Sequence, residues 1–535
     1  MNPPLIRVVL FGASGTMGLE ALKELWRRRE RYDIVLLTRP SGKNRRLLAP
    51  YAEAARVPRE VRKGRAEGRG LTIVWGDATD YRDVELALIG ADWVLDAMAY
   101  ISPQADYHPD MAYAVNTEGI RNIVRAIEAQ PGGAERAHLV YTGTVAETGD
   151  RLPPIHRGRV GDPLKPSVFD YYATTKIAGE RAVLESAIRH WVSLRMTYIM
   201  PTTYRELIAL QDPIAFHMPL NAYMENITDR DAGFGLVNCL DVPDGSDFWR
   251  RAYNMAGGPA MRCVAYDFAG QNYRLNGLSG IEACTDRNWY ALRNFHMQWY
   301  EDSAVLNDYL HHWRDSLDDY WRLIQDDMPL AMKMLAAANR RLPSLRRRIE
   351  QITRERMRRL VEEHRNGTAY WYRHRSDLRI SAFFKDYATY EAIPPWGVSM
   401  PRFDPEPEAG GLDHGYDESR SQLGLSDLQG AACFRGGACL STEWQGDLHS
   451  VLNWRCAAGH EFSLRPYTVL KAGHWCPQCV PPPWDFDAEA RRNPFFAQVW
   501  YTNHDPGESN YYPDDCTQDI VCADEESQQA PSARR

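Results

Sequence analysis

The sequence predicts an α/β fold in which helices cover both faces of a doubly wound parallel sheet, and three observations support this prediction. The apolar run at residues 5–11 is followed by a glycine-rich turn and then by a segment with helical periodicity. A second apolar run, at residues 33–37, has the length of a strand. The chain has 535 residues and is 44% hydrophobic, which is enough to form a buried core. We expect a small substrate domain, a helical segment and a small metal-binding module to follow this sheet.

The glycine-rich turn has the sequence GASGTMG. Gly12 allows a tight turn, Gly15 lets the backbone approach a pyrophosphate, and Gly18 lets the following helix pack closely. The N-terminus of that helix would face the anion. The segment therefore predicts a dinucleotide-binding Rossmann unit. Its expected cofactor contacts are Gly12, Ser14, Gly15, Thr16, Met17 and Gly18.

The end of the second strand indicates which dinucleotide is bound. Arg39 stands where a site for NAD(H) usually carries an acidic residue, and an arginine suits the 2′-phosphate of NADP(H). Lys43, Arg45 and Arg46 could add positive charge to the same pocket, and a solvated basic loop is the alternative for these three. We therefore favour NADP(H) over NAD(H).

Five later segments, LTIVWGDATD, ADWVLDAMAYIS, AYAVNTEGIRNIV, AHLVYTGTVAETG and YYATTK, follow one another along the chain. In this order they resemble the extended short-chain dehydrogenase/reductase family, whose members include NAD-dependent epimerases and dehydratases. The resemblance implies that Tyr172 and Lys176 match the family's Tyr-x-x-x-Lys pair. It also implies that Thr144 matches the family's serine or threonine, with Thr142 as the nearby alternative. The resemblance covers residues 5–325.

Two further positions follow from the same resemblance. The family's helix asparagine matches Asn116, which would order the helix and a proton-relay water. Its adenine-contacting aspartate matches Asp77, with Ala78 beside it at the cofactor.

The chemistry of hydride transfer explains why these residue types are needed. The reacting oxygen exchanges a proton, and a free tyrosine with a pKa of about 10 is a poor base at neutral pH. One helical turn separates Tyr172 from Lys176, so both side chains lie on one face of the helix. Lys176 would stabilise the tyrosine phenolate and, as the family implies, hold the nicotinamide ribose, while Thr144 hydrogen-bonds the reacting oxygen. We predict an NADP(H)-dependent oxidoreductase that reduces a carbonyl or oxidises an alcohol.

One departure from the family narrows the reaction. The family's sugar-nucleotide 4,6-dehydratases carry Asp-Glu after the catalytic threonine, where this chain has Val145 and Ala146. Without that acid and base, elimination of water is disfavoured. An epimerase acting on a sugar nucleotide is the alternative enzyme. A protein that senses NADP(H) and binds a macromolecule is the alternative from another class, but it would have no need of the complete Thr144, Tyr172 and Lys176 set.

The length of the chain predicts more than one structural unit. We expect two helices separated at Pro343, then a short strand and a proline-rich linker, and finally a module rich in cysteine and histidine. The predicted units are a Rossmann and substrate domain at 1–325, a helical segment at 326–375, a linker at 376–411, a zinc-binding module at 412–500 and a disordered tail at 523–535.

The second of the two helices, at residues 344–365, is strongly basic. Its arginines could meet nucleic acid or an acidic carrier protein, but the glutamates interleaved with them favour a solvated face. The buried stripe would then consist of Ile349, Ile352, Met357 and Leu360. The arginines are Arg346, Arg347, Arg348, Arg354, Arg356, Arg358 and Arg359.

Four residues near the end of the chain have the spacing of a metal site. Cys456 and His460 form one pair, and Cys476 and Cys479 the other. Three thiolates and one imidazole satisfy a tetrahedral Zn²⁺, and the arrangement resembles small treble-clef or zinc-ribbon modules. Because all four positions are protein ligands, the ion would be structural. His474 is the competing imidazole, although we favour a histidine on a polar turn.

The remaining cysteines and the net charge limit other functions. Cys433 and Cys439 could form a second site but are interpreted as ordinary core thiols. A net charge of −8 gives no sign of nucleic-acid binding, and the chain holds no apolar run long enough to span a membrane. The first strand begins almost at once, leaving no room for a signal peptide, so we expect a cytoplasmic protein. The expected partner is a small carbonyl or alcohol substrate, and a homodimer is one assembly that we consider.

Overall fold

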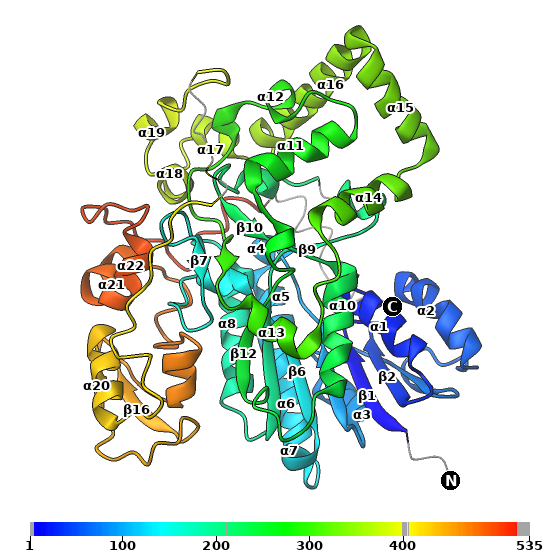
Figure 1. Ribbon diagram of the computed structural model, residues 1–535, viewed down its shortest axis with the longest axis vertical. Coiled ribbons are helices and arrows are strands. Elements are labelled where there is room, and N and C mark those ends of the chain that lie inside the picture. Colours follow the sequence, from blue (N-terminus) through cyan, green and yellow to red (C-terminus); the bar gives the residue numbers. More distant parts are fainter. Residues whose placement is uncertain (1–4, 210, 399–403, 405, 522–535) are drawn as a thin grey trace.

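The computed structural model describes residues 5–209, 211–398, 404 and 406–521. Its centre is an eight-stranded sheet with the order β12-β8-β6-β5-β1-β2-β4-β3 (Figure 1). Strand β3 is antiparallel to β4, and all other neighbours in this sheet are parallel. The predicted α/β fold with a doubly wound parallel sheet is therefore confirmed. The strands are β1 (Ile6–Phe11), β2 (Tyr32–Thr38), β3 (Gly64–Glu67), β4 (Leu71–Trp75), β5 (Trp93–Asp96), β6 (His138–Thr144), β8 (His190–Met196) and β12 (Arg251–Met255).

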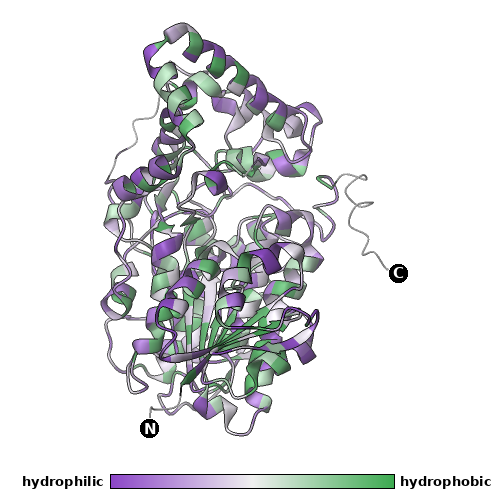
Figure 2. Cartoon of the chain, turned by 90° about the vertical axis from the view of Figure 1, so that its right-hand side faces the viewer, coloured by the Kyte–Doolittle hydropathy of each residue, from purple (hydrophilic) through white to green (hydrophobic). Residues whose placement is uncertain are grey.

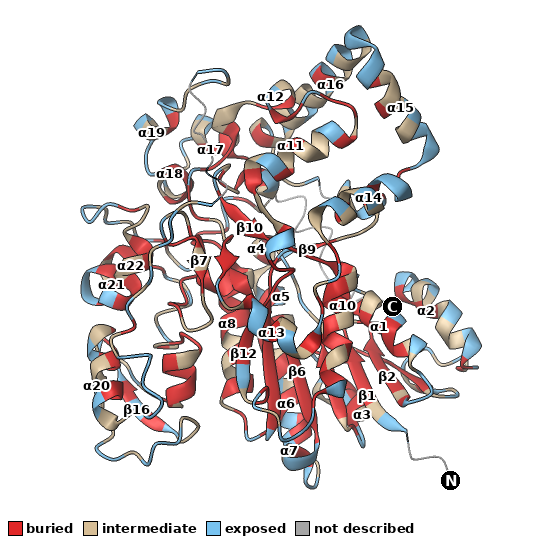
Figure 3. Cartoon of the chain, viewed as in Figure 1, coloured by how far each residue is buried: buried red, intermediate tan, exposed pale blue. Residues whose placement is uncertain are grey.

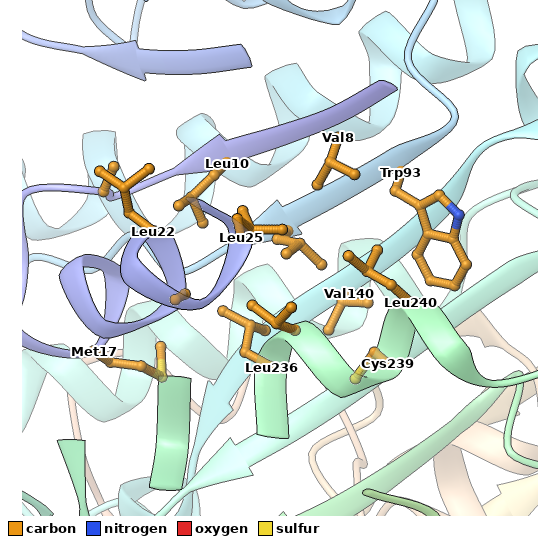
Figure 4. Packing of buried hydrophobic residues seen from close by; sticks show 14 of the residues in the cluster. Val8, Leu10, Met17, Leu22, Leu25, Trp93, Val140, Leu236, Cys239 and Leu240 are labelled. Atoms are coloured by element: carbon orange, nitrogen blue, oxygen red, sulfur yellow. The ribbon is translucent and has the colours of Figure 1, made fainter. Parts of the chain in front are cut away.

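Helices cover both faces of this sheet because the strands bury alternate residues on opposite sides. Val8 and Leu10 face α1 and α10, whereas Val9 and Phe11 face α3, α6 and α8. Figure 4 shows the first of these cores, with Leu22 among the side chains from α1 that pack toward the strands. Figure 2 shows the strands as a hydrophobic layer within the molecule. The covering helices are α1 (Thr16–Arg27), α3 (Tyr81–Leu88), α6 (Gly119–Ala129), α8 (Tyr171–Leu184) and α10 (Asp229–Asn238).

Shorter elements lie beside the carboxyl ends of the parallel strands and connect the sheet with the helical arm. They form small two-stranded sheets and a set of helices around a core that includes Met200 and Tyr320. The strands are β7 (Arg157–Gly158), β9 (Ile199–Met200), β10 (Tyr223–Glu225), β11 (Ile227–Thr228), β13 (Arg262–Val264) and β14 (Trp299–Tyr300). Of the helices, α9 (Tyr204–Leu207), α11 (Ala265–Leu275) and α14 (Leu317–Asp327) contribute to this core. The other helices before the arm are α2 (Gly42–Ala54), α4 (Gln104–Tyr107), α5 (Pro109–Ala112), α12 (Ile281–Cys284), α13 (Ser303–Leu310) and α7 (Gly133–Arg136), which precedes β6 at the amino end of that strand.

The helical arm consists of α15 (Leu330–Arg341) and α16 (Pro343–Glu362), as the break at Pro343 predicted. Figure 3 shows that much of this arm is exposed. Met357 and Leu360 pack against a buried cluster, but Ile352 is 57% exposed, so the predicted buried stripe is wrong at that position. Glu350 is buried instead and accepts a hydrogen bond from the amide of Ser279.

The ion pairs of α16 agree with a solvated basic face. Arg354 pairs with Asp286, and Arg358 and Arg359 both pair with Glu355. These contacts occupy part of the positive charge that a nucleic acid would need.

The short strand predicted after the arm is wrong. The chain there forms α17 (Thr368–Arg373), α18 (Asp377–Phe384) and α19 (Tyr387–Glu391). Ile380, Phe383 and Phe384 are buried at three- and four-residue spacing, which is the periodicity of a helix. The aromatic residues of this segment favour a strand by local preference. The segment forms helices instead, because these side chains pack into a buried cluster with the rest of the chain.

The C-terminal part folds around a three-stranded antiparallel sheet and packs directly on the parallel sheet. Tyr467 and Ala472 belong to the same core as Trp191 of β8. Trp484 packs with Tyr171, the first residue of α8, and with Phe169 two residues before it. The predicted unit boundaries remain predictions. The elements are α20 (Leu425–Phe434), β15 (Ala438–Cys439), β16 (Leu452–Arg455), β17 (Glu461–Leu464), α21 (Phe486–Arg492) and α22 (Pro494–Trp500).

Two predictions concern the chain as a whole. Within the described ranges, no helix combines the length and the apolar character needed to cross a membrane. The tail predicted to be disordered, 523–535, lies outside the described residues.

Candidate functional site

The glycine turn connects β1 to α1 at the carboxyl edge of the sheet. Gly12 has a φ of +77°, and a Cβ there would lie 2.5 Å from the carbonyl oxygen of Ala97. A Cβ on Gly18 would lie 2.1 Å from the carbonyl oxygen of Gly12. Both positions therefore require glycine, as the sequence indicated.

The first turn of α1 is suited to an anion. Its N-cap is Gly15, which is exposed and offers no side chain to the amides of the first turn. These amides and the helix dipole are therefore available to a phosphate. Thr16 is exposed and Ser14 half-buried beside the turn, whereas the side chain of Met17 points into the core, so Met17 could contribute only its backbone.

The end of β2 presents one unpaired cation. Arg39 is exposed, and its guanidinium forms no hydrogen bond or ion pair within the part of the chain that the structure describes. Asn44 donates to the carbonyl oxygen of Arg39 at 2.9 Å and so fixes the turn. Arg45 instead bonds the carbonyl oxygens of residues 61 and 62 and lies 4.1 Å from the ring centre of Trp75. Arg45 thus supports the fold, while Lys43 and Arg46 remain exposed nearby.

Asp77 and Ala78 follow β4, the next strand along this edge. The carboxylate of Asp77 accepts hydrogen bonds from the amide and the hydroxyl of Thr79, at 3.0 and 2.9 Å. The amide of Asp77 donates to the carboxylate of Asp83 in the first turn of α3. This bond ties the loop after β4 to that helix. Because β2 and β4 are neighbours in a parallel sheet, their carboxyl ends place Arg39 and Asp77 along the same edge.

Thr144, Tyr172 and Lys176 lie near the carboxyl end of β6. Thr144 is the last residue of that strand, and its side chain is close enough to Tyr172 on α8 to act on the pKa of the phenol. Burial raises the pKa of Tyr172, although Thr144 opposes this effect. Lys176 is 1% exposed and lies 4.3 Å from the ring centre of Tyr141. Thr142 donates to the carbonyl oxygen of Asp96 and is therefore committed to the sheet.

Several buried carboxyl groups that were not predicted from the sequence surround Lys176. Burial lowers the pKa of Lys176, while Asp96, Glu147 and Glu180 act in the opposite direction. Asp96 ends β5 and is 1% exposed, and burial raises its pKa to about 6 although Lys176 lowers it. A charged residue that closes the apolar run Trp93–Leu95 is the signal that could have indicated this position.

Asn116 positions the backbone next to this site. It lies in a π-helical turn (Tyr113–Glu118), and its side-chain oxygen accepts from the amide of Tyr100 at 2.7 Å. Its side-chain nitrogen donates to the carbonyl oxygen of Tyr100 and to the hydroxyl of Thr175, both at 3.0 Å. Asn116 thus ties the loop after β5 to α8, and its part in a proton-relay water stays a prediction.

A buried charge cluster joins α8 to the C-terminal part. Arg195 on β8 contacts Glu180 at 2.7 Å and Glu147 at 3.4 Å, and it donates to the carbonyl oxygen of Ala472 at 2.7 Å. His474 bonds Glu180 at 2.8 Å. His474 therefore lies outside the group formed by the three cysteines and His460, and it is buried, which corrects its interpretation as a histidine on a polar turn.

The charges within this cluster are unequal. Burial raises the pKa of Glu147 well above its ordinary value, and the neighbouring Glu180 raises it further. Burial also raises the pKa of Glu180, but the positive charge of Arg195 outweighs this effect. The pKa of Glu180 is therefore held well below its ordinary value. Of the two carboxyl groups beside the guanidinium, Glu147 therefore holds a proton more tightly than Glu180.

The structure brings together the four residues predicted to bind a metal. The ligand atoms of Cys456, His460, Cys476 and Cys479 all lie within 4.8 Å of one another. The sulfurs of Cys456 and Cys479 are 4.0 Å apart, and the Nδ1 of His460 is 3.5 Å from the sulfurs of Cys476 and Cys479. Zn–S bonds of about 2.3 Å in a tetrahedron place two sulfurs about 3.8 Å apart, so these residues fit a zinc ion.

The other cysteines lie elsewhere. Cys433 is exposed, which corrects its interpretation as a core thiol, and Cys439 is half-buried. Among the described residues, neither belongs to a group with metal-ligand geometry.

Comparison with known proteins identifies the part of the chain that carries this site. Residues 8–204 match the NAD dependent epimerase/dehydratase family. This segment includes the glycine turn and the Thr144, Tyr172 and Lys176 group, so the resemblance predicted from the sequence is supported there. No curated protein sequence matches the chain.

Three solved structures with similar folds have low sequence identity. The UDP-Glc/GlcNAc 4-epimerase from Campylobacter jejuni is 14% identical over 60% of this chain and 98% of its own, with a TM-score of 0.44. The dTDP-glucose 4,6-dehydratase from Bacillus anthracis, in complex with NAD, is 14% identical over 60% and 96%, with a TM-score of 0.44. The dTDP-glucose 4,6-dehydratase double mutant from Streptomyces venezuelae, with NAD bound, is 16% identical over 59% and 96%, with a TM-score of 0.43.

Proposed function

We propose that the protein is an NADP(H)-dependent oxidoreductase that interconverts a carbonyl and an alcohol on a small molecule. The observation that carries this proposal is the proximity of Thr144, at the end of β6, to Tyr172 in the first turn of α8, with the buried Lys176 one helical turn further along. These residues lie at the same sheet edge as the uncapped first turn of α1. The match of this segment to the epimerase/dehydratase family supports the same class of chemistry.

The protein's own residues would control the proton at the reacting oxygen. Tyr172 would donate that proton during reduction, and its raised pKa keeps it protonated at neutral pH. Thr144 would hold the oxygen in place next to Tyr172. The ammonium of Lys176, supported by nearby carboxylates, would hold positive charge beside the site. NADPH, when bound, supplies the hydride.

NADP(H) is proposed over NAD(H) because of the end of β2. The exposed guanidinium of Arg39 is available for the 2′-phosphate, and phosphate is bound well by a bidentate arginine. The open amides of α1 would hold the pyrophosphate, and Asp77 with Ala78 would border the adenine.

The decisive experiment compares turnover with cofactor binding in Tyr172→Phe. Loss of the phenol should abolish carbonyl reduction while NADPH affinity changes little, because only the proton donor is removed. Fluorescence titration with NADPH and single-turnover absorbance would measure the two effects separately. Retained reduction in this variant would place the chemistry elsewhere.

Epimerisation of a sugar nucleotide is a second candidate because the matched family includes epimerases. An epimerase restores its cofactor in every cycle, whereas an oxidoreductase consumes one NADPH for each product formed. Product analysis with stoichiometric NADPH therefore distinguishes the two. The complete Thr144, Tyr172 and Lys176 set argues against a protein that only senses the cofactor.

We also propose that Cys456, His460, Cys476 and Cys479 hold a structural zinc ion. All four ligands come from the protein, so no position is left for a substrate or a reactive water.

A further inference from the structure

The helical arm projects from one end of the molecule and carries large apolar side chains that are exposed (Figure 1). Leu330 and Met334 on α15 are 71% and 59% exposed. Leu342, in the turn between the two helices, is 53% exposed, and Ile352 on α16 is 57% exposed. Large apolar side chains that gather on one exposed element mark an interaction surface.

The helical period of α15 turns its apolar side chains outward. Met332 packs against a buried core, and Asn339 donates to the carbonyl oxygen of Asn276 at 3.0 Å, so these two residues mark the side that faces the protein. Leu330 and Met334 each lie two positions from Met332 and are therefore on the opposite side of the helix. Their exposure in the structure agrees with this placement.

The same part of the chain is purely basic. Residues 328–349 contain six basic residues and no acidic one, although the whole chain has a net charge of −8. The carboxylates nearest in sequence, Asp327 and Glu350, accept hydrogen bonds from the amides of Tyr204 and Ser279. The six basic residues are Lys333, Arg340, Arg341, Arg346, Arg347 and Arg348.

Most of this positive charge is not neutralised by the protein. Arg346 approaches Glu350 at 3.9 Å, whereas Lys333 and Arg340 donate to backbone carbonyl oxygens. Within the part of the chain that the structure describes, three exposed arginines form no ion pair: Arg341, Arg347 and Arg348. The arm therefore combines open positive charge with open apolar surface.

We propose that the helical arm docks on a membrane surface that contains anionic lipids and lies in the head-group region without crossing the bilayer. Leu330 and Met334 would enter the boundary of the acyl chains, while the arginines bind lipid phosphates. Arginine suits this place because its guanidinium bonds phosphate oxygens and its aliphatic stem lies along apolar surface. This inference does not depend on the proposed function.

Other anionic partners match the arm less well. Residues 328–349 contain no aromatic side chain on which nucleic-acid bases could stack. A helix of an acidic protein would lie in a hydrophobic groove, whereas the outward side of α15 is the surface of a single helix (Figure 3). A lipid surface offers both phosphates for the arginines and an apolar phase for the aliphatic side chains.

Vesicles of two compositions test the proposal with the full-length protein. Sedimentation should show binding to phosphatidylcholine vesicles that contain about one third phosphatidylglycerol, and at least roughly tenfold weaker binding to vesicles of phosphatidylcholine alone. Added salt should weaken the binding to the anionic vesicles, because it screens the charges at the membrane surface.

A triple variant removes the unpaired charge. In Arg341→Gln, Arg347→Gln and Arg348→Gln combined, the affinity for anionic vesicles should fall about 100-fold, because each basic residue near the surface contributes roughly fivefold. The matched control makes the same change at three exposed arginines outside the arm and should bind like the wild type. The control positions are Arg62, Arg69 and Arg136.

A double variant removes the apolar contact without changing the charge. Leu330→Gln combined with Met334→Gln should lower the affinity for anionic vesicles by about tenfold or more. The control, Ile89→Gln combined with Val451→Gln, changes two exposed apolar residues outside the arm and should leave the affinity unchanged.

The outcomes either support or overturn the membrane surface. No binding to anionic vesicles, or equal binding to neutral ones, would overturn the proposal. Equal losses in the arm variants and in their controls would show that the arm is not the docking surface. Binding to polyglutamate without binding to vesicles would indicate an acidic protein as the partner and would also overturn it. Circular dichroism checks that each variant is folded.

Discussion

The two groups of charged residues along α8 differ in how they are paired. Toward the start of the helix, Lys176 is 1% exposed, lies 4.3 Å from the ring centre of Tyr141 and forms no ion pair with another described residue. One turn after Lys176, Glu180 is closed off by Arg195 and His474, with every one of these side chains at most 1% exposed. One helix thus carries residues of the proposed catalytic site and, one turn later, the buried ion pair that holds it to the rest of the chain. The C-terminal part is therefore held against α8, the helix that bears the proposed catalytic residues.

Removal of the proposed zinc ion should have the largest effect, on the folding of the C-terminal part. A structural zinc contributes on the order of 10 kcal/mol to the folding of a small module, so its loss should unfold the C-terminal part. NADPH binding should survive, because its proposed site uses the amides of α1 and Arg39. Elemental analysis should find one zinc per chain, and circular dichroism with NADPH titration after chelation would follow the two parts.

Matched cysteine variants provide the control for this prediction. Cys476→Ser should lose the metal, whereas Cys433→Ser, at an exposed cysteine outside the cluster, should keep it. A carefully purified wild-type protein without zinc would refute the site. A chemical step that depended on the metal in the folded protein would instead make the ion catalytic.

The second largest effect is expected at Arg195. Replacing it with methionine leaves Glu180 as a buried carboxylate without its guanidinium, which should lower the free energy of unfolding by about 3–5 kcal/mol. Denaturant unfolding would measure the change. The control Arg31→Met breaks an exposed ion pair with Asp241 and should cost less than about 1 kcal/mol. Similar losses in both variants would show that the buried cluster adds no special cohesion.

The smallest effect is expected at Arg39, in the proposed cofactor site. Arg39→Asp should weaken NADPH binding roughly 10- to 100-fold, because charge-assisted bonds to the 2′-phosphate are lost. NADH binding should be spared or improved. The control Arg69→Asp changes an exposed arginine two residues before β4, at the amino end of that strand. It should change neither affinity. Equal affinity of the wild type for both cofactors would contradict the assignment of NADP(H).

Some of the site could be predicted from the sequence because it depends on local spacing. The glycines at 12 and 18 are required by contacts within the same turn and with the neighbouring strand. Tyr172 and Lys176 share a helix face because four residues make about one turn. The errors came where local preference lost to packing: the aromatic segment 377–384 forms a helix, and Ile352 faces solvent on α16.

The sequence by itself determined the parallel sheet, the glycine turn, the Tyr-x-x-x-Lys pair and the cluster of three cysteines and one histidine. Each is defined by residue type at short separation or by strands alternating with helices. Only the tertiary structure decided the surroundings of Lys176 and Glu180 and the contacts of Asn366. His474 and Glu180 are 294 positions apart, and Asn366 and Tyr107 are 259 positions apart. No pattern along the chain encodes such pairs, because they form only when the C-terminal part and the helices after the arm pack onto the sheet and exclude water from the charges between them.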